Sequence, residues 1–207
     1  MPASFLGLPV EIRNEIYKYL LVSSEPIDLQ FGEEQLTPSI LFTNTTILHE
    51  ARVLLYGHNC FNFTRYLGDI SKFFDTIGLI NASHVRCILI RLPDLIQTKD
   101  GVSLDQHDLS TLEKTLSQCT NLKTIIADLS STLDMEKELE LFDPAIRDNA
   151  LALLAAQFRA IPSHPEIVLE VLENSPGSGF RRKMQSHGWK LKVVKPEEDG
   201  WCRQLWW

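Results

Sequence analysis

Residues 5–21 of the chain read FLGLPVEIRNEIYKYLL, and they predict a helix around which the rest of the fold can be placed. Pro9 suits the first turn of a helix, where its missing N–H needs no partner and its φ is already helical. Glu11 follows in the same turn, where the positive end of the helix dipole favours a carboxylate. Apolar residues recur at a spacing of four, and this stripe comprises Leu8, Ile12, Ile16 and Leu20.

Two interpretations of this stripe stay open. Tyr17 and Leu21 widen it, so the helix is expected to be covered on two sides, as a core helix at one end of a domain would be. Alternatively, part of the stripe is reserved for the groove of another protein. Periodicity alone does not separate the two, because a core and a docking groove both select apolar residues at helical spacing.

The composition is that of an ordinary globular protein. The 207 residues are 44% apolar and 23% charged, which suits one domain, or one domain with a small appendage. A formal net charge of −7 argues against nucleic-acid binding. No signal-like segment opens the sequence, and no apolar run approaches the roughly 18–20 residues of a membrane span. We therefore expect an intracellular protein, cytoplasmic or nuclear, with no membrane contact.

Motifs that carry chemistry are not found. The four cysteines, at positions 60, 87, 119 and 202, are too far apart in sequence for a zinc knuckle or a redox pair. Cys60 and Cys87 lie in apolar runs, and we expect both to be buried, reduced thiols. The six histidines are scattered, and no glycine-rich phosphate loop or nucleophile elbow occurs. The sequence therefore predicts no catalytic residues, no cofactor and no metal.

Three surface features are kept as hypotheses. Gly177-Ser178-Gly179 precedes a short predicted helix whose N-terminus could bind an anion, although a plain turn explains it as well. Basic residues between Arg181 and Lys195 form either solvated surface or a site for an acidic partner. Residues 200–207 hold three tryptophans, and we expect them to fold back on the domain because exposed tryptophans favour aggregation.

The first half of the chain predicts helices joined by short strands. Residues 27–31 and 59–63 alternate apolar and polar side chains, as half-buried strands do. We expect these two strands to pair in a small two-stranded sheet. Two further helices are expected over residues 39–56 and 66–77, and each is followed by a glycine that ends it.

The second half predicts an α/β layer. Strands alternate with helices, which favours parallel strands joined by right-handed crossovers. The expected strands are residues 85–92, 122–129, 167–172 and 189–194. The expected helices are residues 109–119, 145–160 and 180–187, with a loop at 94–105 and an exposed acidic excursion at 130–143. The strands are unevenly spaced, so an irregular leucine-rich-repeat-like curve and a small open sheet fit equally well.

Two segments together resemble the fungal F-box-like proteins. Residues 8–21 match a motif of Leu-Pro, any residue, Glu-Ile-Arg, two residues of any kind, Ile-Tyr and a closing pair of leucines. Residues 47–63 read ILHEARVLLYGHNCFNF and match a second motif, which contains Glu-Ala, Leu-Leu-Tyr and Asn-x-Phe-x-Phe. The resemblance covers about the first 65 residues, and the remainder is similar to the family only in general pattern.

The resemblance implies a docking role. An F-box binds the adaptor subunit of a cullin–RING ubiquitin ligase through its Leu-Pro turn and the following helix face, and a C-terminal repeat domain holds the substrate. Carried over, the partner-binding residues would be Leu8, Pro9, Ile12, Ile16 and Leu20. The chain departs from the family in a longer connection between the two helices, and in having Asn44 and Thr45 where the family has a Cys-Arg pair. These departures leave open that the stripe is sealed inside the domain.

The expected fold is therefore α+β. It has F-box-like helices with a small two-stranded sheet over residues 1–64, then an irregular βα layer, leucine-rich-repeat-like and mainly parallel, over residues 65–207, in one continuous domain. The expected function is a non-enzymatic interaction module, an F-box-type substrate receptor. The alternative is a structural or regulatory protein whose F-box-like helices are buried internally. An enzyme built from distant residues is the third hypothesis, and it requires a deep polar cleft with acid, base and nucleophile.

Overall fold

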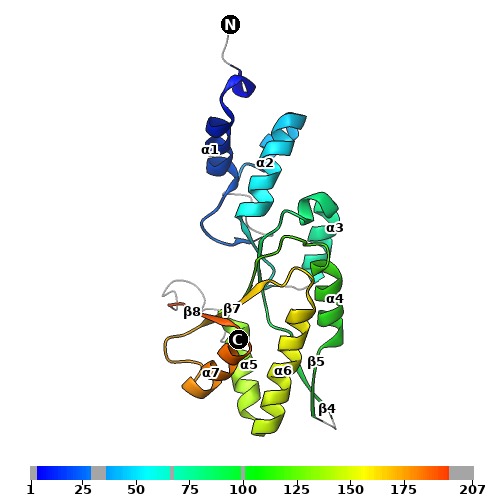
Figure 1. Cartoon of the computed structure of the whole chain (residues 1–207), viewed down its shortest axis with the longest axis vertical. Coiled ribbons are helices and arrows are strands. Elements are labelled where there is room, and N and C mark those ends of the chain that lie inside the picture. The colour runs from blue at the N-terminus through cyan, green and yellow to red at the C-terminus, as the bar shows by residue number, and fades with distance from the viewer. Residues whose placement is uncertain (1–3, 29–35, 66–67, 99–100, 196–207) are drawn as a thin grey trace, which may run out of the picture.

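The computed structural model describes residues 4–28, 36–65, 68–98 and 101–195. Within these ranges the chain forms an elongated α+β molecule, with a helix hairpin at the N-terminal end and an α/β body beyond it (Figure 1). No helix in these ranges is long and apolar enough to cross a membrane. The expected return of residues 200–207 onto the domain falls outside the described residues.

The N-terminal hairpin consists of α1, Val10–Leu21, and α2, Thr45–His58, which pack against each other. A short 3-10 helix, Phe5–Gly7, comes before α1, and Pro9 is the N-cap residue of α1. A 3-10 helix, Pro38–Phe42, comes before α2. The first helix is thus where the sequence predicts it.

The helix expected over residues 39–56 is broken in two. The side chain of Asn44 accepts a hydrogen bond from the backbone N–H of Thr46 at 2.8 Å, and this cap starts α2 as a new helix. α2 then passes through Gly57 and ends at His58. Gly57 is therefore not the stop that the sequence predicts, because Asn59 satisfies the last turn instead, donating from Nδ2 to the carbonyl of Leu55 at 2.7 Å.

Six strands form one sheet, in the same order as they occur in the chain. The strands are β1 (Ile27–Asp28), β2 (Cys60–Asn62), β3 (Cys87–Ile90), β6 (Thr124–Ala127), β7 (Glu166–Val171) and β8 (Lys190–Val193). Every pairing in this sheet is parallel, as the helical connections predict. The sequential order means that the chain winds in one direction, as in a repeat solenoid, and does not reverse as in a doubly wound sheet.

The expectation of a small separate sheet near the N-terminus is wrong. β1 does pair with β2, with Ile27 opposite Phe61, but β2 also pairs with β3, where Phe61 is opposite Ile88. Both short strands therefore form one edge of the large sheet. The sheet takes strands from both sides of the boundary expected between residues 64 and 65.

Helices cover one face of the sheet. They are α3 (Gly68–Ala82), α4 (Gln106–Leu116), α5 (Leu129–Glu140), α6 (Pro144–Ala160) and α7 (Ser178–Ser186), and all five contribute buried side chains to the main core. From the strands, Phe61, Ile88, Ile125 and Ile167 enter this core. Alternate strand residues point to the opposite face, because successive side chains of a strand point opposite ways. We call this opposite side the second face, formed by Cys60, Asn62, Cys87, Leu89, Thr124, Ile126, Glu166, Val168, Glu170, Lys190 and Lys192.

The expectation of two buried thiols is wrong for the same reason. Cys60 and Cys87 are unbridged, as expected, but both are only half-buried. Their neighbours Phe61 and Ile88 point into the core, so strand alternation turns the two cysteines to the second face.

A hairpin occupies a segment that the sequence predicts as a loop. Residues 94–105 contain β4 (Leu95–Thr98) and β5 (Gly101–Leu104), which pair antiparallel in a separate two-stranded sheet. Val102 and Leu104 are buried in the main core. The segment is short and rich in polar residues, which favours a loop, but Leu95 of β4 packs against the same core and so both strands are anchored to it.

The acidic segment, residues 130–143, is mostly helix α5 and not an exposed excursion. Its N-cap, Asp128, accepts hydrogen bonds from the backbone and the hydroxyl of Ser131. Met135 and Leu139, one turn apart, are buried. Apart from the half-buried Glu136, the acidic residues are exposed, and their number hides the apolar spacing in the sequence.

α3 consists of two helical segments that meet at Gly78, the residue at which the sequence predicts the helix to end. Gly78 lies at φ 74° and ψ 166°, where the helix is interrupted, and the chain then remains helical to Ala82. This backbone region is essentially restricted to glycine. Gly78 therefore ends the first helical segment, as the sequence predicts, and the short helical segment that follows it to Ala82 is not predicted.

Candidate functional site

An ion pair joins the two helices of the N-terminal hairpin. Arg13 of α1 donates to both carboxylate oxygens of Glu50 of α2, with 2.9 Å between Nε and Oε2. Arg13 also donates to the carbonyl of Leu8 at 2.6 Å, which fixes the turn before α1. The hydroxyl of Tyr17 donates to Oε2 of Glu50 at 2.9 Å. One carboxylate thus holds two side chains that are one helical turn apart.

The pKa values of these groups follow from their contacts. Hydrogen bonding from Arg13 lowers the pKa of Glu50, although burial opposes this effect. Burial, and then the hydrogen bond to Glu50, raise the pKa of Tyr17 to about 12. Each group is held in its ordinary state at neutral pH, so the cluster is suited to structure and not to proton transfer.

A buried amide joins the far ends of the same two helices. Asn59, which follows α2, donates from Nδ2 to the carbonyl of Leu21 at 2.6 Å and to that of Leu55 at 2.7 Å. Its Oδ1 accepts the backbone N–H of Ser23 at 2.8 Å. One side chain therefore satisfies orphan groups at the C-terminal ends of both α1 and α2.

The hairpin has a small hydrophobic core of its own. The buried members are Tyr17, Leu21, Leu41, Ile47, Ala51, Leu54 and Leu55. Phe5 packs edge-on against Tyr17, with 5.6 Å between ring centroids. Tyr17 and Leu21, which the sequence analysis adds to the apolar stripe, belong to this core and not to an outer surface.

The remaining stripe lies on the outer side of α1. Ile12 is 49% exposed, and Tyr19, which the sequence analysis does not place, is 87% exposed. Ile12, Ile16 and Tyr19 fall within an arc of about 60° on a helical projection, well away from Tyr17. The signal in the sequence that points to Tyr19 is its spacing of three from Ile16, which puts it on the same side of the helix.

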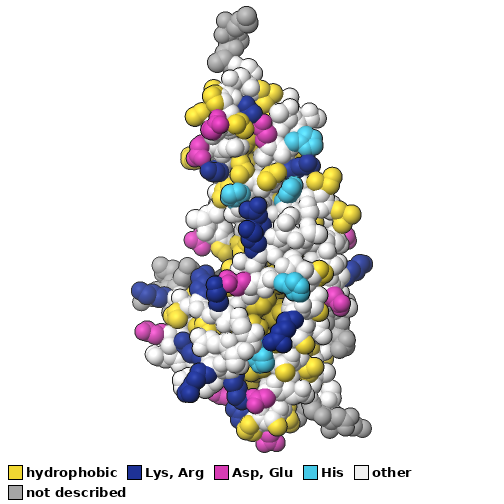
Figure 2. Space-filling model, in the orientation of Figure 1, with side chains coloured by type: hydrophobic (Ala, Val, Ile, Leu, Met, Phe, Trp, Pro, Cys, Tyr) yellow, Lys and Arg dark blue, Asp and Glu magenta, His cyan; other side chains and the backbone are white. Residues whose placement is uncertain are grey.

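The five predicted partner-binding residues are not equally exposed. Pro9 and Ile12 are exposed, whereas Leu8 and Ile16 are half-buried. Leu20 is half-buried too, and it packs against the hairpin core. The structure thus places these residues along one side of the hairpin, with Leu20 at the boundary between outer side and core. Figure 2 shows apolar side chains at this end of the molecule, beside acidic ones.

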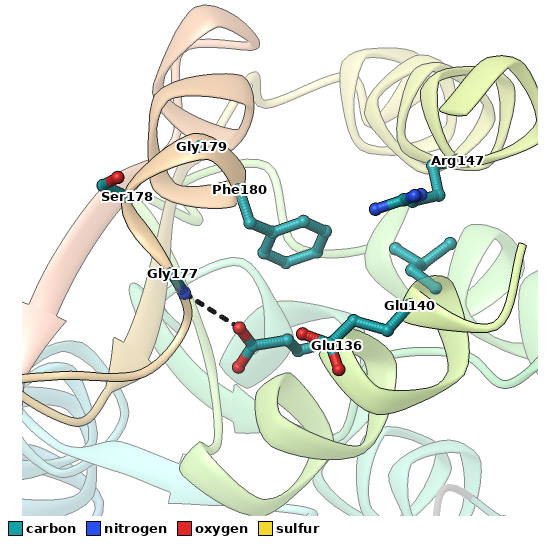
Figure 3. Close-up of a pocket in the computed structure, with 8 residues that line it drawn as sticks. Glu136, Glu140, Arg147, Gly177, Ser178, Gly179 and Phe180 are labelled. Atoms are coloured by element: carbon teal, nitrogen blue, oxygen red, sulfur yellow. Dashed lines mark hydrogen bonds between the residues drawn. The ribbon is translucent and has the colours of Figure 1, made fainter. Parts of the chain in front are cut away.

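A second candidate is the pocket at the N-terminus of α7, of about 200 Å³ (Figure 3). Its lining is Glu136, Leu139, Glu140, Arg147, Gly177, Ser178, Gly179 and Phe180. The carboxylate of Glu136 accepts the backbone N–H of Gly177 at 2.9 Å and the hydroxyl of Ser175 at 2.6 Å. The protein therefore supplies its own anion where the Gly-Ser-Gly turn could have bound one.

This pocket does not assemble a catalytic group. Figure 3 shows the side chain of Ser178 directed away from Glu136 and from the cavity. Arg147 donates from Nε to the carbonyl of Phe142 at 2.9 Å, so its guanidinium helps to hold the α5–α6 connection. The lining contains neither histidine nor cysteine.

The basic residues near the C-terminal end of the described chain are largely paired. Lys183 contacts Asp148, Lys190 contacts Glu166 at 2.5 Å, and Lys192 contacts Glu170 at 3.1 Å. Arg181 instead donates to backbone carbonyls ahead of α7, including that of Pro176 at 2.8 Å. These contacts favour the solvated-surface interpretation over a site for an acidic partner, because the surface charge is neutralised locally.

Comparisons with known proteins give no match. No protein-family model matches the chain, and neither does any curated protein or any solved structure. Among the described residues, no three histidine, cysteine or acidic side chains are grouped as a metal site would need. The α1–α2 hairpin is therefore the candidate site that the geometry favours.

Proposed function

We propose that this chain is a non-enzymatic interaction protein whose α1–α2 hairpin docks, as an F-box does, onto the adaptor subunit of a cullin–RING ubiquitin ligase. The partner-binding residues are Leu8, Pro9, Ile12, Ile16, Leu20 and Tyr19. The α/β body then holds a protein substrate. Because such ligases act inside the cell, the proposal also places the protein in the cytoplasm or nucleus.

The separation of α1 into two sides carries this proposal. The polar residues of the two F-box-like motifs make contacts within the hairpin: Arg13 and Glu50 join the two helices, and Asn59 bonds to the end of each. The apolar residues Tyr17 and Leu21 fill the hairpin core. Ile12 is left with half its side chain in water, although a fold alone would favour a polar residue there.

The hairpin is built to present that outer side rigidly. The ion pair fixes the N-terminal half of α1, and the Asn59 amide fixes its C-terminal end. A rigid helix face loses little conformational entropy on binding, which favours affinity. Burying the exposed part of an isoleucine side chain contributes roughly 1 kcal/mol, so several such residues are needed for a stable complex.

The charges beside the stripe indicate the kind of groove that fits. Glu11 and Glu15 are exposed on α1, and Glu15 pairs with Lys18 at 2.7 Å. An apolar groove with basic residues on its rim would complement this surface. We therefore expect binding to the adaptor to weaken as salt concentration rises.

The two other hypotheses receive less support. A structural role with the F-box-like helices buried internally is disfavoured by the exposure of Ile12 and Tyr19. An enzymatic role is disfavoured by the α7 pocket, where Glu136 is already bonded and Ser178 points outward.

Co-purification with the adaptor subunit tests the proposal. Wild type is compared with Leu8→Asp and Ile12→Asp, and with Leu141→Asp as a matched control, because Leu141 is 85% exposed on the α5–α6 connection. Circular dichroism must show that all variants are folded. The proposal predicts retention of wild type and Leu141→Asp and loss of Ile12→Asp. Failure of wild type to bind, or equal retention of folded Ile12→Asp, would overturn it.

A further inference from the structure

Two cysteines that are far apart in sequence lie opposite each other in the sheet. Cys60 is on β2 and Cys87 is on β3, and the two are direct partners in the parallel register. Both are on the second face, half-buried and unbridged. Neighbouring strands are about 4.8 Å apart, and disulfides span Cα separations of about 4.4–6.8 Å. The backbone therefore already holds this pair at a separation that a disulfide can span.

The two thiols differ in their electrostatic surroundings. The hydrogen bond between them lowers the pKa of Cys87 and raises that of Cys60. Lys192 of β8 adds a positive charge that favours thiolate at both sulfurs, whereas Glu170 of β7 opposes it at Cys60. Lys192 and Glu170 are themselves paired at 3.1 Å on the same face. Cys87 is thus the better nucleophile, and Cys60 is its hydrogen-bonding neighbour.

We propose that Cys60 and Cys87 form an oxidisable dithiol, a modification site that a hydroperoxide converts into a disulfide joining β2 to β3. In the first step the Cys87 thiolate attacks the terminal peroxide oxygen and the O–O bond breaks, giving a sulfenic acid at Cys87 and releasing an alkoxide, or hydroxide when the oxidant is hydrogen peroxide. In the second step the sulfur of Cys60 attacks the sulfur of Cys87, and the sulfenic hydroxyl leaves as water with the thiol proton. The peroxide is reduced and the two thiols are oxidised by two electrons.

Cys119 provides a natural contrast within the same chain. Its side chain is fully buried, and burial raises the pKa of its thiol to about 12. Its sulfur lies 3.9 Å from the carbonyl of Thr115 in the same helical region. A buried, protonated thiol reacts slowly with peroxide, so Cys119 should stay reduced when Cys87 is oxidised.

The disulfide would tie together two parts of the fold. β2 follows α2 directly, through Asn59, and β3 lies further into the sheet. A bond from Cys60 to Cys87 would therefore attach the C-terminal end of α2, where the N-terminal hairpin joins the sheet, to the α/β body. This inference does not depend on what the hairpin binds.

Mass spectrometry of the full chain after treatment with hydrogen peroxide tests the proposal. Wild type should lose the mass of two hydrogen atoms, regain it with dithiothreitol, and yield one linked peptide pair containing Cys60 and Cys87. Cys60→Ser should instead carry a sulfenic acid at Cys87 that dimedone traps. Cys87→Ser should form no linked pair, and Cys119→Ser should behave as wild type.

Three results would overturn the proposal: a linked pair that contains Cys202 or Cys119, oxidation of Cys87 only to sulfinic or sulfonic acid in wild type, or no reaction at either cysteine. The peptide map of wild type decides among these results even if a serine variant does not fold. Circular dichroism of each variant before oxidation identifies such a case.

Discussion

Arg13 and Glu50, 37 residues apart in the sequence, form a two-pronged ion pair that holds α1 against α2. Tyr17 donates to the same carboxylate, so three residues of the two resemblance motifs meet at one point. These residues therefore explain why the motif needs its charges: they assemble the hairpin. The motif's exposed apolar residue, Ile12, takes no part in this assembly and is available for a partner.

Removing the Tyr17 hydroxyl should change both stability and its pH dependence. Tyr17→Phe should lower the free energy of unfolding by about 1–2 kcal/mol at pH 7, because a hydrogen bond to a charged group is lost. The fold raises the pKa of Tyr17 from 10 to about 12, so its contribution is complete below pH 10 and is lost as the pH rises towards 12. Urea denaturation at pH 7 and above pH 10 measures both effects.

Tyr19→Phe is the control for this prediction, because Tyr19 lies on the same helix with its side chain exposed. It should leave the free energy of unfolding at pH 7 unchanged, because its hydroxyl is on the exposed side of the helix. An alkaline slope of Tyr17→Phe equal to that of wild type would show that the Tyr17–Glu50 contact is not formed in solution.

At acidic pH the same cluster should weaken because the carboxylate of Glu50 becomes protonated. The fold lowers the pKa of Glu50 below its usual 4.5, so the contribution of its carboxylate is present above that pH and is lost as the pH falls below it. Glu50→Gln should therefore unfold more readily than wild type at pH 7, and the difference should shrink at pH 3. Thermal melts at the two pH values measure it, and a difference that does not shrink would contradict the account.

The Asn59 side chain should be among the most sensitive polar positions of the hairpin. Asn59→Ala leaves two helix-end carbonyls and the Ser23 N–H without their present partner, and should cost about 3 kcal/mol. Asn121→Ala removes a single exposed hydrogen bond, to the carbonyl of Ser83, and should cost less than about 1 kcal/mol. Urea denaturation of both variants tests the contrast, and equal costs would refute the role given to Asn59.

Gly78 should resist substitution even though the space around it is open. A Cβ at Gly78 would meet no atom within 4 Å, yet its φ of 74° and ψ of 166° disfavour any other residue. Gly78→Ala should therefore cost about 1–3 kcal/mol through backbone strain. Gly179→Ala, in helix α7 and also in open space, should be neutral or slightly stabilising. Comparing the two melting temperatures separates strain from crowding.

Local sequence patterns predict those helices and strands whose apolar residues recur with a clear period. α1 begins beside Pro9 as expected, β3, β6 and β8 lie within the predicted ranges, and β7 begins one residue before its predicted range, at Glu166. For β3 the prediction succeeds because a buried strand in a parallel sheet selects continuous apolar residues, whereas β8 is mostly exposed and is recognised from its alternation of lysine with apolar residues. The helix α5 is not evident from the sequence because its many acidic side chains mask the spacing of Met135 and Leu139, and because its other buried residues, Ser131 and Thr132, are polar.

Long-range pairing could not be predicted in the same way. Nothing near Phe61 in the sequence indicates that β2 would pair with β3 as well as with β1, because strand order depends on the whole topology. The position of Cys60 opposite Cys87 depends on that pairing, so it could not be predicted from the sequence either. On the candidate docking side, the stripe followed from spacing, but the assignment of Tyr17 to the core required knowing where α2 packs.

A calorimetric titration of the purified adaptor subunit with wild type, Ile12→Asp and Leu141→Asp tests the central claim most directly. The account predicts a measurable Kd for wild type, the same Kd for Leu141→Asp, and at least about a tenfold weaker Kd for folded Ile12→Asp, because a carboxylate would enter an apolar groove. If wild type gives no binding, or if Ile12→Asp binds as tightly as wild type, the outer side of α1 is not the docking surface.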